Sequence, residues 1–160
     1  MTKQLIEIKG FKELQSKIKR LPDKVKRREV LKILGQVANP TVKAARAQAP
    51  QSKKPHVQAG KRTYKVIEPG NLKKSIGKIR GKRGSAKVNA VLYVGPKSKG
   101  RKNDGFYGAF VHGGTKLQAP NKFMDRAYGQ TKGLVTKDAE VKIEKYIQKQ
   151  VKRLSSVWVI

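Results

Sequence analysis

The chain has 160 residues, the size of one typical domain, and 37% of them are hydrophobic, which is enough for a core if they are patterned. Its 39 Lys and Arg outnumber its 10 Asp and Glu and give a formal net charge of +29. Because self-repulsion of this size opposes the compact state, the composition indicates a polyanionic partner, with nucleic acid first and an acidic protein surface second.

The first part of the chain is predicted to be mainly helical. Lys3–Lys9 alternates loosely, which fits a short edge strand or an ordered lead-in, and apolar residues at spacings of three and four predict a short helix over 11–21. The same period predicts a long helix over 23–48. Pro40 lies inside that pattern, so the helix should kink there or split into two, because proline removes a backbone donor and crowds the preceding turn.

A basic loop insertion is predicted next, at about 51–69. Prolines and glycines interrupt any periodicity there, and several lysines add charge. Within it, the stretch 62–67 is rich in β-prone residues and would form a β-arm, which is a common way to reach a neighbouring subunit. We therefore expect Tyr64 and Val66 to take part in a contact with a subunit or a neighbour.

Strands are predicted in the middle of the chain. A hairpin runs from Ser75–Arg80 through a glycine-containing turn to Val88–Val94, and a third strand covers Phe106–His112. The simplest topology for these strands is an antiparallel meander.

The C-terminal part is predicted to form a long helix that ends at about Arg153. Gly129 and Gly133 each weaken its first part by roughly 1 kcal/mol relative to alanine, so two helices with a break there are the alternative. The last four residues, 157–160, are hydrophobic and include Trp158, the only tryptophan. They would suit a contact with a neighbour or would fold back on the chain's own core.

Together these elements predict a single α+β domain over residues 1–160. An antiparallel sheet of three to five strands would pack against the helix 23–48, kinked at Pro40, and against the C-terminal helix. We expect no secretion, since charged residues interrupt the apolar residues of 1–10, and no membrane contact, since no uncharged apolar run approaches the roughly 20 residues of a membrane-spanning helix.

The side chains that catalysis normally uses are scarce. The chain has no cysteine and two histidines, His56 and His112, too few for a His-rich metal site. The glycines after His112 resemble the oxyanion loop of lipases, but no G-x-S-x-G turn exists. Residues 95–102 have the glycine spacing of a P-loop, yet Arg101 and Lys102 stand where Lys and Ser or Thr are required. We therefore expect no enzyme activity, no cofactor and no metal.

The widest basic field lies over residues 69–103, which contain 11 Lys or Arg and no acidic residue. Lysines outnumber arginines in the whole chain by 29 to 10, and a lysine lacks the planar fork that reads bases bidentately. The field therefore predicts attraction to phosphates that ignores base sequence and weakens with salt. The residues expected to face DNA or an acidic partner are Lys73, Lys74, Lys78, Arg80, Lys82, Arg83, Lys97, Lys99, Arg101 and Lys102.

Several short motifs follow one another along the chain: Gly10-Phe11-Lys12-Glu13-Leu14, Leu21-Pro22-Asp23-Lys24-Val25, Ala44-Ala45-Arg46-Ala47-Gln48, Ala49-Pro50, Gly70-Asn71-Leu72-Lys73-Lys74-Ser75-Ile76, Tyr107-Gly108-Ala109-Phe110-Val111-His112-Gly113-Gly114-Thr115, Ala119-Pro120 and Phe123. In this order and spacing, from about residue 8 to 150, the chain resembles the head-proximal tail-component family of tailed bacteriophages. Members of that family resemble small α+β neck or tail-completion proteins.

The chain departs from that family's pattern in three places. About 20 residues separate Pro50 from Gly70, where the family has only a few, and Pro69 replaces a threonine. His112-Gly113 replaces the acidic residue that commonly precedes Gly-Thr. Asn121-Lys122-Phe123 replaces the common Arg-Pro-Phe ending.

The resemblance implies a structural virion protein without catalytic activity. It would form a homo-oligomeric ring of roughly six or twelve copies in the neck or head-proximal tail, between the portal-side connector and the tail proteins. The ring would join head to tail and surround genomic double-stranded DNA through nonspecific backbone contacts, with Tyr64, Val66 and Trp158 at subunit or neighbour contacts. The protein would be found in the virion, and in the host cytoplasm during assembly. The alternative is a nonspecific nucleic-acid-binding protein of ribosomal or chromatin type.

Overall fold

The computed structural model describes residues 23–59, 64–82, 90–98 and 103–155. The predicted mixture of helices with antiparallel strands is confirmed in this part of the chain. The elements predicted over Lys3–Lys9 and 11–21 lie outside the described residues, as does Trp158. The described elements are α2 (Asp23–Val37), α3 (Asn39–Gln48), β1 (His56–Ala59), β2 (Tyr64–Ile67), α4 (Asn71–Ser75), β3 (Ile76–Arg80), β4 (Leu92–Pro96), α6 (Gly108–Gly113) and α7 (Phe123–Ser155).

The prediction of one helix over 23–48, kinked at Pro40, is wrong: the segment is split into two helices at Ala38, which was the alternative effect of Pro40. Pro40 stands in the first turn of α3, where its missing N–H removes no intrahelical hydrogen bond. The backbone bonds from Ala38 N to Leu34 O and from Val42 N to Ala38 O, both 3.0 Å, keep the helical spacing through the junction. The proline therefore begins a second helix in nearly the same direction.

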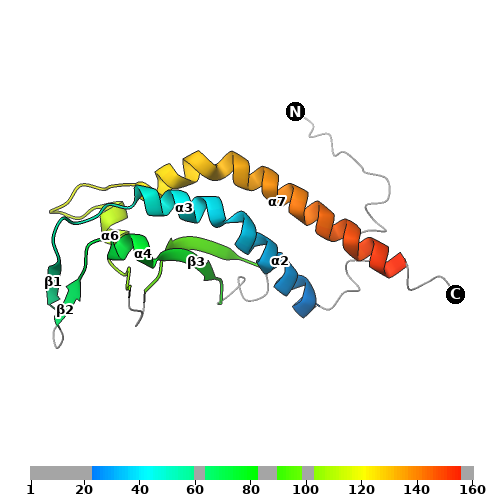
Figure 1. Ribbon diagram of the computed structural model, residues 1–160, viewed down its shortest axis with the longest axis horizontal. Helices are drawn as coiled ribbons and strands as arrows, with labels where there is room; N and C mark the ends of the chain where they lie inside the picture. Colours follow the sequence, from blue (N-terminus) through cyan, green and yellow to red (C-terminus); the bar gives the residue numbers. More distant parts are fainter. Residues whose placement is uncertain (1–22, 60–63, 83–89, 99–102, 156–160) are drawn as a thin grey trace.

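Three layers build the body of the molecule (Figure 1). The α2–α3 pair lies in the middle, with α7 along one side and the β3–β4 hairpin along the other. Phe123 and Ala127, one turn apart on α7, are fully buried, and Ala45 of α3 is buried beside them. The small alanine side chains let the two helices approach closely, and Ile76 at the start of β3 closes this core from the sheet side.

The strands form two separate two-stranded antiparallel sheets, β1–β2 and β3–β4. The predicted single sheet of three to five strands is therefore wrong for the described residues. In the second sheet Ile76 pairs with Pro96 and Arg80 with Leu92, so the predicted hairpin exists but its second strand begins later than Val88. In the first sheet β2 is a strand within the stretch 62–67 where a β-arm was expected, and β1 supplies a partner that the sequence did not predict.

The third strand predicted over Phe106–His112 is wrong, because these residues largely form the short helix α6. Tyr107 and Val111 pack against the core, and their spacing of four residues is helical. Gly108 allows the helix to lie close to β4, since a Cβ there would stand 2.5 Å from Pro96 Cγ. Phe110 of this helix is exposed.

The C-terminal helix α7 is continuous and ends near the predicted Arg153, so the alternative of a break at its glycines is wrong. Gly129 and Gly133 have no atom within 4 Å of an ideal Cβ. The buried hydroxyls of Thr41 on α3 and Thr131 on α7 are 2.9 Å apart, and Thr131 also donates to the Ala127 carbonyl. Packing along α2 and α3 therefore outweighs the weak helix propensity of the two glycines.

Candidate nucleic-acid interface

The predicted basic residues that the structure describes lie on one unit made of α4, β3, β4 and the residues that follow the two strands. Four of them are exposed: Lys73 and Lys74 on α4, Arg80 at the end of β3, and Lys82 just beyond it. Two are partly buried. These two are Lys78 and Lys97. The remaining predicted residues, Arg83, Lys99, Arg101 and Lys102, lie outside the described residues.

The two lysines of α4 border a surface hollow of about 420 Å³, which we call the α4 hollow. Arg46 of α3 lies on its other side, so three cations from two helices face one space. The lining is completed by Gln51, Pro69 and Gly70, and it contains no carboxylate. Gly70 has a φ of +76°, which lets the chain turn sharply into α4. This hollow offers positive charge without a competing acid, as a phosphate site requires.

A second hollow of about 420 Å³ lies between α2 and the β3–β4 hairpin, and we call it the strand hollow. Lys32 of α2 and Lys78 and Arg80 of β3 line it, again without a carboxylate. Its other lining residues are Leu31, Gly35, Gln36, Asn39 and Leu92. The structure thus places Lys73 and Lys74 at one hollow and Lys78 and Arg80 at the other, while Lys82 and Lys97 line neither.

Three basic side chains hold the β3 strand against the helices by donating to backbone carbonyls. The Arg46 guanidinium donates two hydrogen bonds, of 3.1 and 2.9 Å, to the Ile76 carbonyl, and Lys78 Nζ donates to the Gly35 carbonyl. Arg27 donates to the Gly81 carbonyl at 3.2 Å. Arg46 and Lys78 therefore have a structural role as well as a charge in their hollows.

Lys97 folds back over the sheet. A Cβ at Gly77 would lie 2.8 Å from both Lys97 Cε and Nζ, so the lysine side chain occupies the space that this glycine leaves free. Among the described residues that the sequence predicted, Lys73, Lys74, Arg80 and Lys82 are consequently the ones best placed to meet a phosphate backbone.

Arg46 and Lys32 were not among the predicted site residues, although both line a hollow. In the sequence each is one of many cations on a helix face. Their place in a site arises only because α3 packs on α4 and β3, and α2 packs on β4. No local signal in the sequence marks these two residues.

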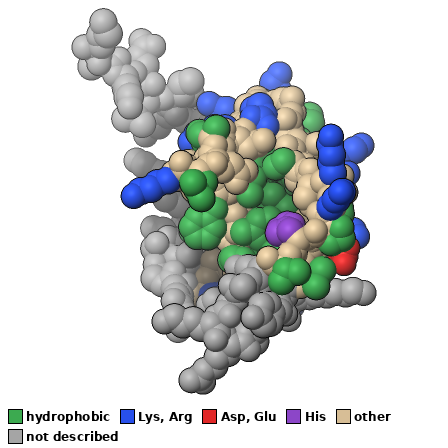
Figure 2. All heavy atoms as spheres, turned by 90° about the vertical axis from the view of Figure 1, so that its left-hand side faces the viewer, with side chains coloured by type: hydrophobic (Ala, Val, Ile, Leu, Met, Phe, Trp, Pro, Cys, Tyr) green, Lys and Arg blue, Asp and Glu red, His purple; other side chains and the backbone are tan. Residues whose placement is uncertain are grey.

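A third hollow, of about 530 Å³, is apolar and lies at the end of the molecule that carries the β1–β2 hairpin. We call it the hairpin groove. Figure 2 shows hydrophobic side chains gathered in the middle of this face. The groove is lined by Pro50, Gln51, Ser52, His56, Val57, Ile67, Glu68, Gly70, Leu72, Phe106, Tyr107, Phe110, Val111 and Gln118. Val66, predicted to contact a neighbour, is exposed on the same hairpin, and Tyr64 is in the same strand.

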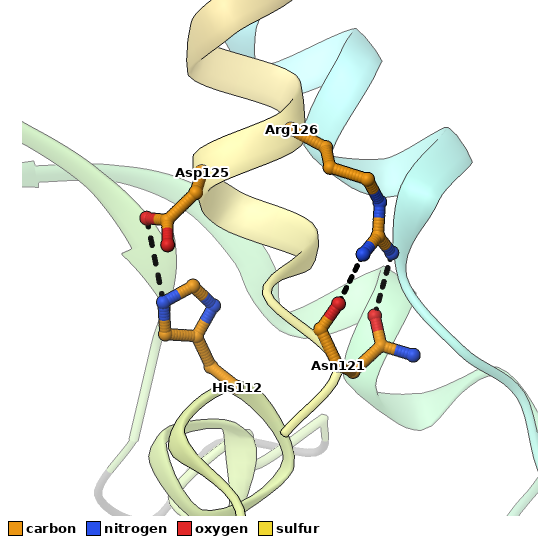
Figure 3. A network of polar contacts seen from close by, with 4 residues as sticks. All are labelled: His112, Asn121, Asp125 and Arg126. Carbon is orange, nitrogen blue, oxygen red and sulfur yellow. Dashed lines mark hydrogen bonds and ion pairs between the residues drawn. The ribbon is translucent and has the colours of Figure 1, made fainter. Parts of the chain in front are cut away.

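His112 takes part in a polar network that joins α6 to the start of α7 (Figure 3). Its Nε2 lies 3.5 Å from Asp125 Oδ1, and its ring meets Phe123 edge to face with 5.6 Å between centroids. Arg126 donates to the backbone and side-chain oxygens of Asn121 and, at 3.0 Å, to Gln48 Oε1. These contacts fix the turn before α7, which gives His112 a structural role.

The described residues contain no group of three or more His, Cys, Asp and Glu side chains that could hold a metal ion. In the same part of the chain no helix has the length and apolar character to cross a membrane. Comparisons with protein-family models, with curated proteins and with solved structures found no match.

Proposed function

We propose that the chain is a structural virion protein of a tailed bacteriophage, which forms an oligomeric ring in the neck or head-proximal tail. The order and spacing of its motifs support the phage part of this proposal. The observation that supports contact with DNA is the pair of basic hollows bordered by the α4–β3–β4 unit. Neither hollow is lined by a carboxylate.

Such a surface suits a conduit that any DNA sequence must cross. Phosphate contacts position a duplex without reading it, and lysines bind phosphates as point charges. Lys73 and Lys74 are exposed beside Arg46, and Arg80 is exposed near Lys32. We therefore assign the lining of the DNA channel to the α4–β3–β4 unit, with roughly six or twelve copies around the channel.

The neighbours in this proposal are the portal-side connector and the tail proteins, and the ring joins the head to the tail. The protein would occur in the host cytoplasm during assembly and in the virion afterwards. Its role would be structural rather than catalytic.

The DNA part of the proposal is tested with the double variant Lys73→Gln/Lys74→Gln. Each lost phosphate contact lowers the slope of log K against log salt by about 0.9, so the slope should fall by roughly 2 if both lysines touch phosphates. The measurement is a titration of a random-sequence duplex at several salt concentrations. Lys132→Gln/Lys137→Gln, two exposed lysines of α7, is the control with the same change in net charge and should keep the wild-type slope.

An equal fall of the salt slope in the two variants would mean that net charge alone attracts the DNA. This result would contradict a channel face on α4 and β3. Native mass and negative-stain images of the same samples test the ring. The +29 charge also favours the ribosomal or chromatin-type alternative, which predicts a monomer that binds any nucleic acid tightly with a steep salt dependence.

A further inference from the structure

The hairpin groove is an apolar hollow lined by aromatic rings, and the described residues leave it open. The hairpin and α6 sides contribute apolar and aromatic side chains, namely His56, Val57, Ile67, Phe106, Tyr107 and Phe110. The Tyr107 ring meets His56 and Phe106 edge to face, with 6.4 and 5.5 Å between centroids. Val57 and Phe110, one from each side, are 62% and 57% exposed. Exposed apolar side chains around one hollow mark a site for an apolar partner.

The charges at the groove disfavour a basic occupant. Its lining contains no lysine or arginine, and Glu68 is its one carboxylate. The exposed lysines Lys53 and Lys54 directly follow the lining residue Ser52 and outnumber that carboxylate. A segment with excess positive charge is repelled there, whereas an uncharged apolar segment is not.

One stretch of the chain has the matching character. Residues 156–160 carry no charge and four hydrophobic side chains, in the sequence Ser156-Val157-Trp158-Val159-Ile160. The other stretches outside the described residues each contain lysine or arginine: 1–22, 60–63, 83–89 and 99–102. A tryptophan placed in an apolar pocket is among the strongest single contributors to a protein contact. The segment 156–160 is therefore the occupant that suits the groove.

This segment cannot reach the groove of its own copy. The groove lies beside the start of α7, because the carbonyl of its lining residue Val111 accepts a hydrogen bond of 3.0 Å from Asn121 N, just before that helix. The helix has 33 residues, which span about 50 Å, and ends at Ser155. Five extended residues span at most about 18 Å. Figure 1 shows the hairpin at one end of the long axis and the end of α7 at the other.

The helices at the end of α7 offer the segment little apolar surface in its own copy. Among the described residues, no exposed large hydrophobic side chain lies on α2, and the last one on α7 is Val141, about 21 Å before Ser155 along the helix. The exposed side chains nearer the end of α7 include the cations Lys149, Lys152 and Arg153. A groove on another copy therefore suits the segment better than these helices do.

We propose that residues 156–160 of one copy bind in the hairpin groove of a second copy, with Trp158 against the rings of the groove. The segment begins where α7 ends, far from the groove of its own copy, so the contact joins two different surfaces. Such a contact is heterologous, and repeating it gives a ring where the rotation closes. The inference rests on the proposed ring and identifies the contact that builds it.

Two variants separate the two sides of this contact. Val57→Gln/Phe110→Gln, the groove variant, makes the groove polar and keeps Trp158. Trp158→Ser/Val159→Ser, the segment variant, makes the segment polar and keeps the groove. Both groove positions are more than half exposed, so their substitution does not open the core. Neither variant changes the net charge.

Leu134→Gln/Val141→Gln is the matched control for the groove variant. Leu134 and Val141 lie on α7, line no part of the groove, and are 60% and 48% exposed. The control therefore also removes two exposed hydrophobic side chains, at positions away from the proposed contact. Circular dichroism checks that all three variants fold.

The fluorescence of Trp158 and sedimentation velocity give the result. Trp158 is the only tryptophan, so the emission reports on this segment alone, and it moves to shorter wavelengths when the ring leaves water. We expect wild type and the control to emit at shorter wavelengths and to form assemblies larger than a dimer. The groove variant alone should be monomeric, with the emission of a water-exposed tryptophan.

An equimolar mixture of the two variants keeps one intact groove and one intact segment. All of its emission comes from Trp158 of the groove variant, so binding to the groove of the segment variant should move that emission to shorter wavelengths. Each copy has one side of the contact removed, so the mixture should form dimers and stop there. A mixture without this shift would overturn the proposed contact.

Three further outcomes would also overturn it. A wild type with the emission of a water-exposed tryptophan would mean that the segment binds nothing. Short-wavelength emission from the groove variant alone would place Trp158 elsewhere, for example on its own copy. Unchanged assembly of the groove variant or the segment variant would leave the ring in place and move its contact to another surface.

The same samples distinguish this failure from failure of the proposed function. Both variants leave Lys73, Lys74 and Arg80 unchanged, so their binding to a random-sequence duplex still reports on the basic hollows. The expected shift and dimers in the mixture, together with a wild type that binds no DNA, would support the contact and contradict the DNA channel.

Discussion

The Tyr146 side chain on α7 is partly buried, and among the described residues its hydroxyl has no hydrogen-bond partner. Burial and, to a smaller extent, the carboxylate of Glu29 on α2 raise the pKa of the Tyr146 phenol. A buried hydroxyl without a partner loses its hydration and gains nothing in return. This position therefore reduces the stability of the contact between α2 and α7.

Tyr146→Phe removes that hydroxyl and should raise the free energy of unfolding by up to about 1 kcal/mol, as measured by urea denaturation. Tyr107→Phe is the control, since the Tyr107 hydroxyl accepts a hydrogen bond of 3.1 Å from Asn71 Nδ2, and it should lower stability by about 1 kcal/mol. The raised pKa disfavours the phenolate in the folded state, so the advantage of Tyr146→Phe over wild type should grow as pH rises past about 10. An equal fall in the free energy of unfolding of both variants would contradict the unpaired state of the Tyr146 hydroxyl.

Among the elements, α7 carries two glycines that its packing tolerates but does not require. Gly129 and Gly133 are exposed, and an ideal Cβ at either would meet no atom within 4 Å. Gly129→Ala and Gly133→Ala should therefore each stabilise the protein by about 0.5–1 kcal/mol through helix propensity alone. Chemical denaturation measures the gain.

Gly114→Ala is the contrasting variant for the same experiment. Gly114 has a φ of +81°, and a Cβ there would lie 2.9 Å from Pro120 N, so alanine should destabilise the turn after α6. Destabilisation by Gly129→Ala or Gly133→Ala would indicate that α7 needs a local bend at that position.

The long helices were predictable from the sequence, but the way in which the helices and strands pack together was not. Repeated apolar residues were enough for α7 and for the helical region of α2 and α3, and Pro40 marked the junction. The prediction of a strand over 106–112 failed because the residues of this run that meet the core, Tyr107 and Val111, are four apart, which is a helical spacing. The single sheet failed because a local pattern can mark a hairpin such as β3–β4, but it does not show whether that hairpin pairs with another one, and β1–β2 forms a separate sheet.

The candidate site was predictable to the same extent. Lys73, Lys74 and Arg80 stand out because no acid interrupts the segment that contains them. Arg46 and Lys32 reach the two hollows through packing between elements far apart in the chain, which a local pattern does not record.

The whole molecule is governed by its excess of positive charge. With 39 basic and 10 acidic residues, folding brings like charges together, and dissolved ions screen that repulsion. We expect the urea midpoint to rise as sodium chloride increases from about 0.05 M to about 0.5 M, a range over which the Debye length falls by roughly a factor of three. The same salt increase should weaken binding to DNA. A midpoint that is constant or falls would mean that local ion pairs outweigh the net repulsion.

The core draws its residues from a wide span of the chain. Ala45 of α3 and Ala49, which follows that helix, meet Phe123 and Ala127 of α7, so the core stays open until the start of α7 is available. During synthesis, the ribosome must therefore release more than three-quarters of the chain before any of it can bury these side chains. Until then the growing polypeptide is a strongly cationic, unfolded segment in a compartment filled with RNA, and its folding is completed only after translation has nearly ended.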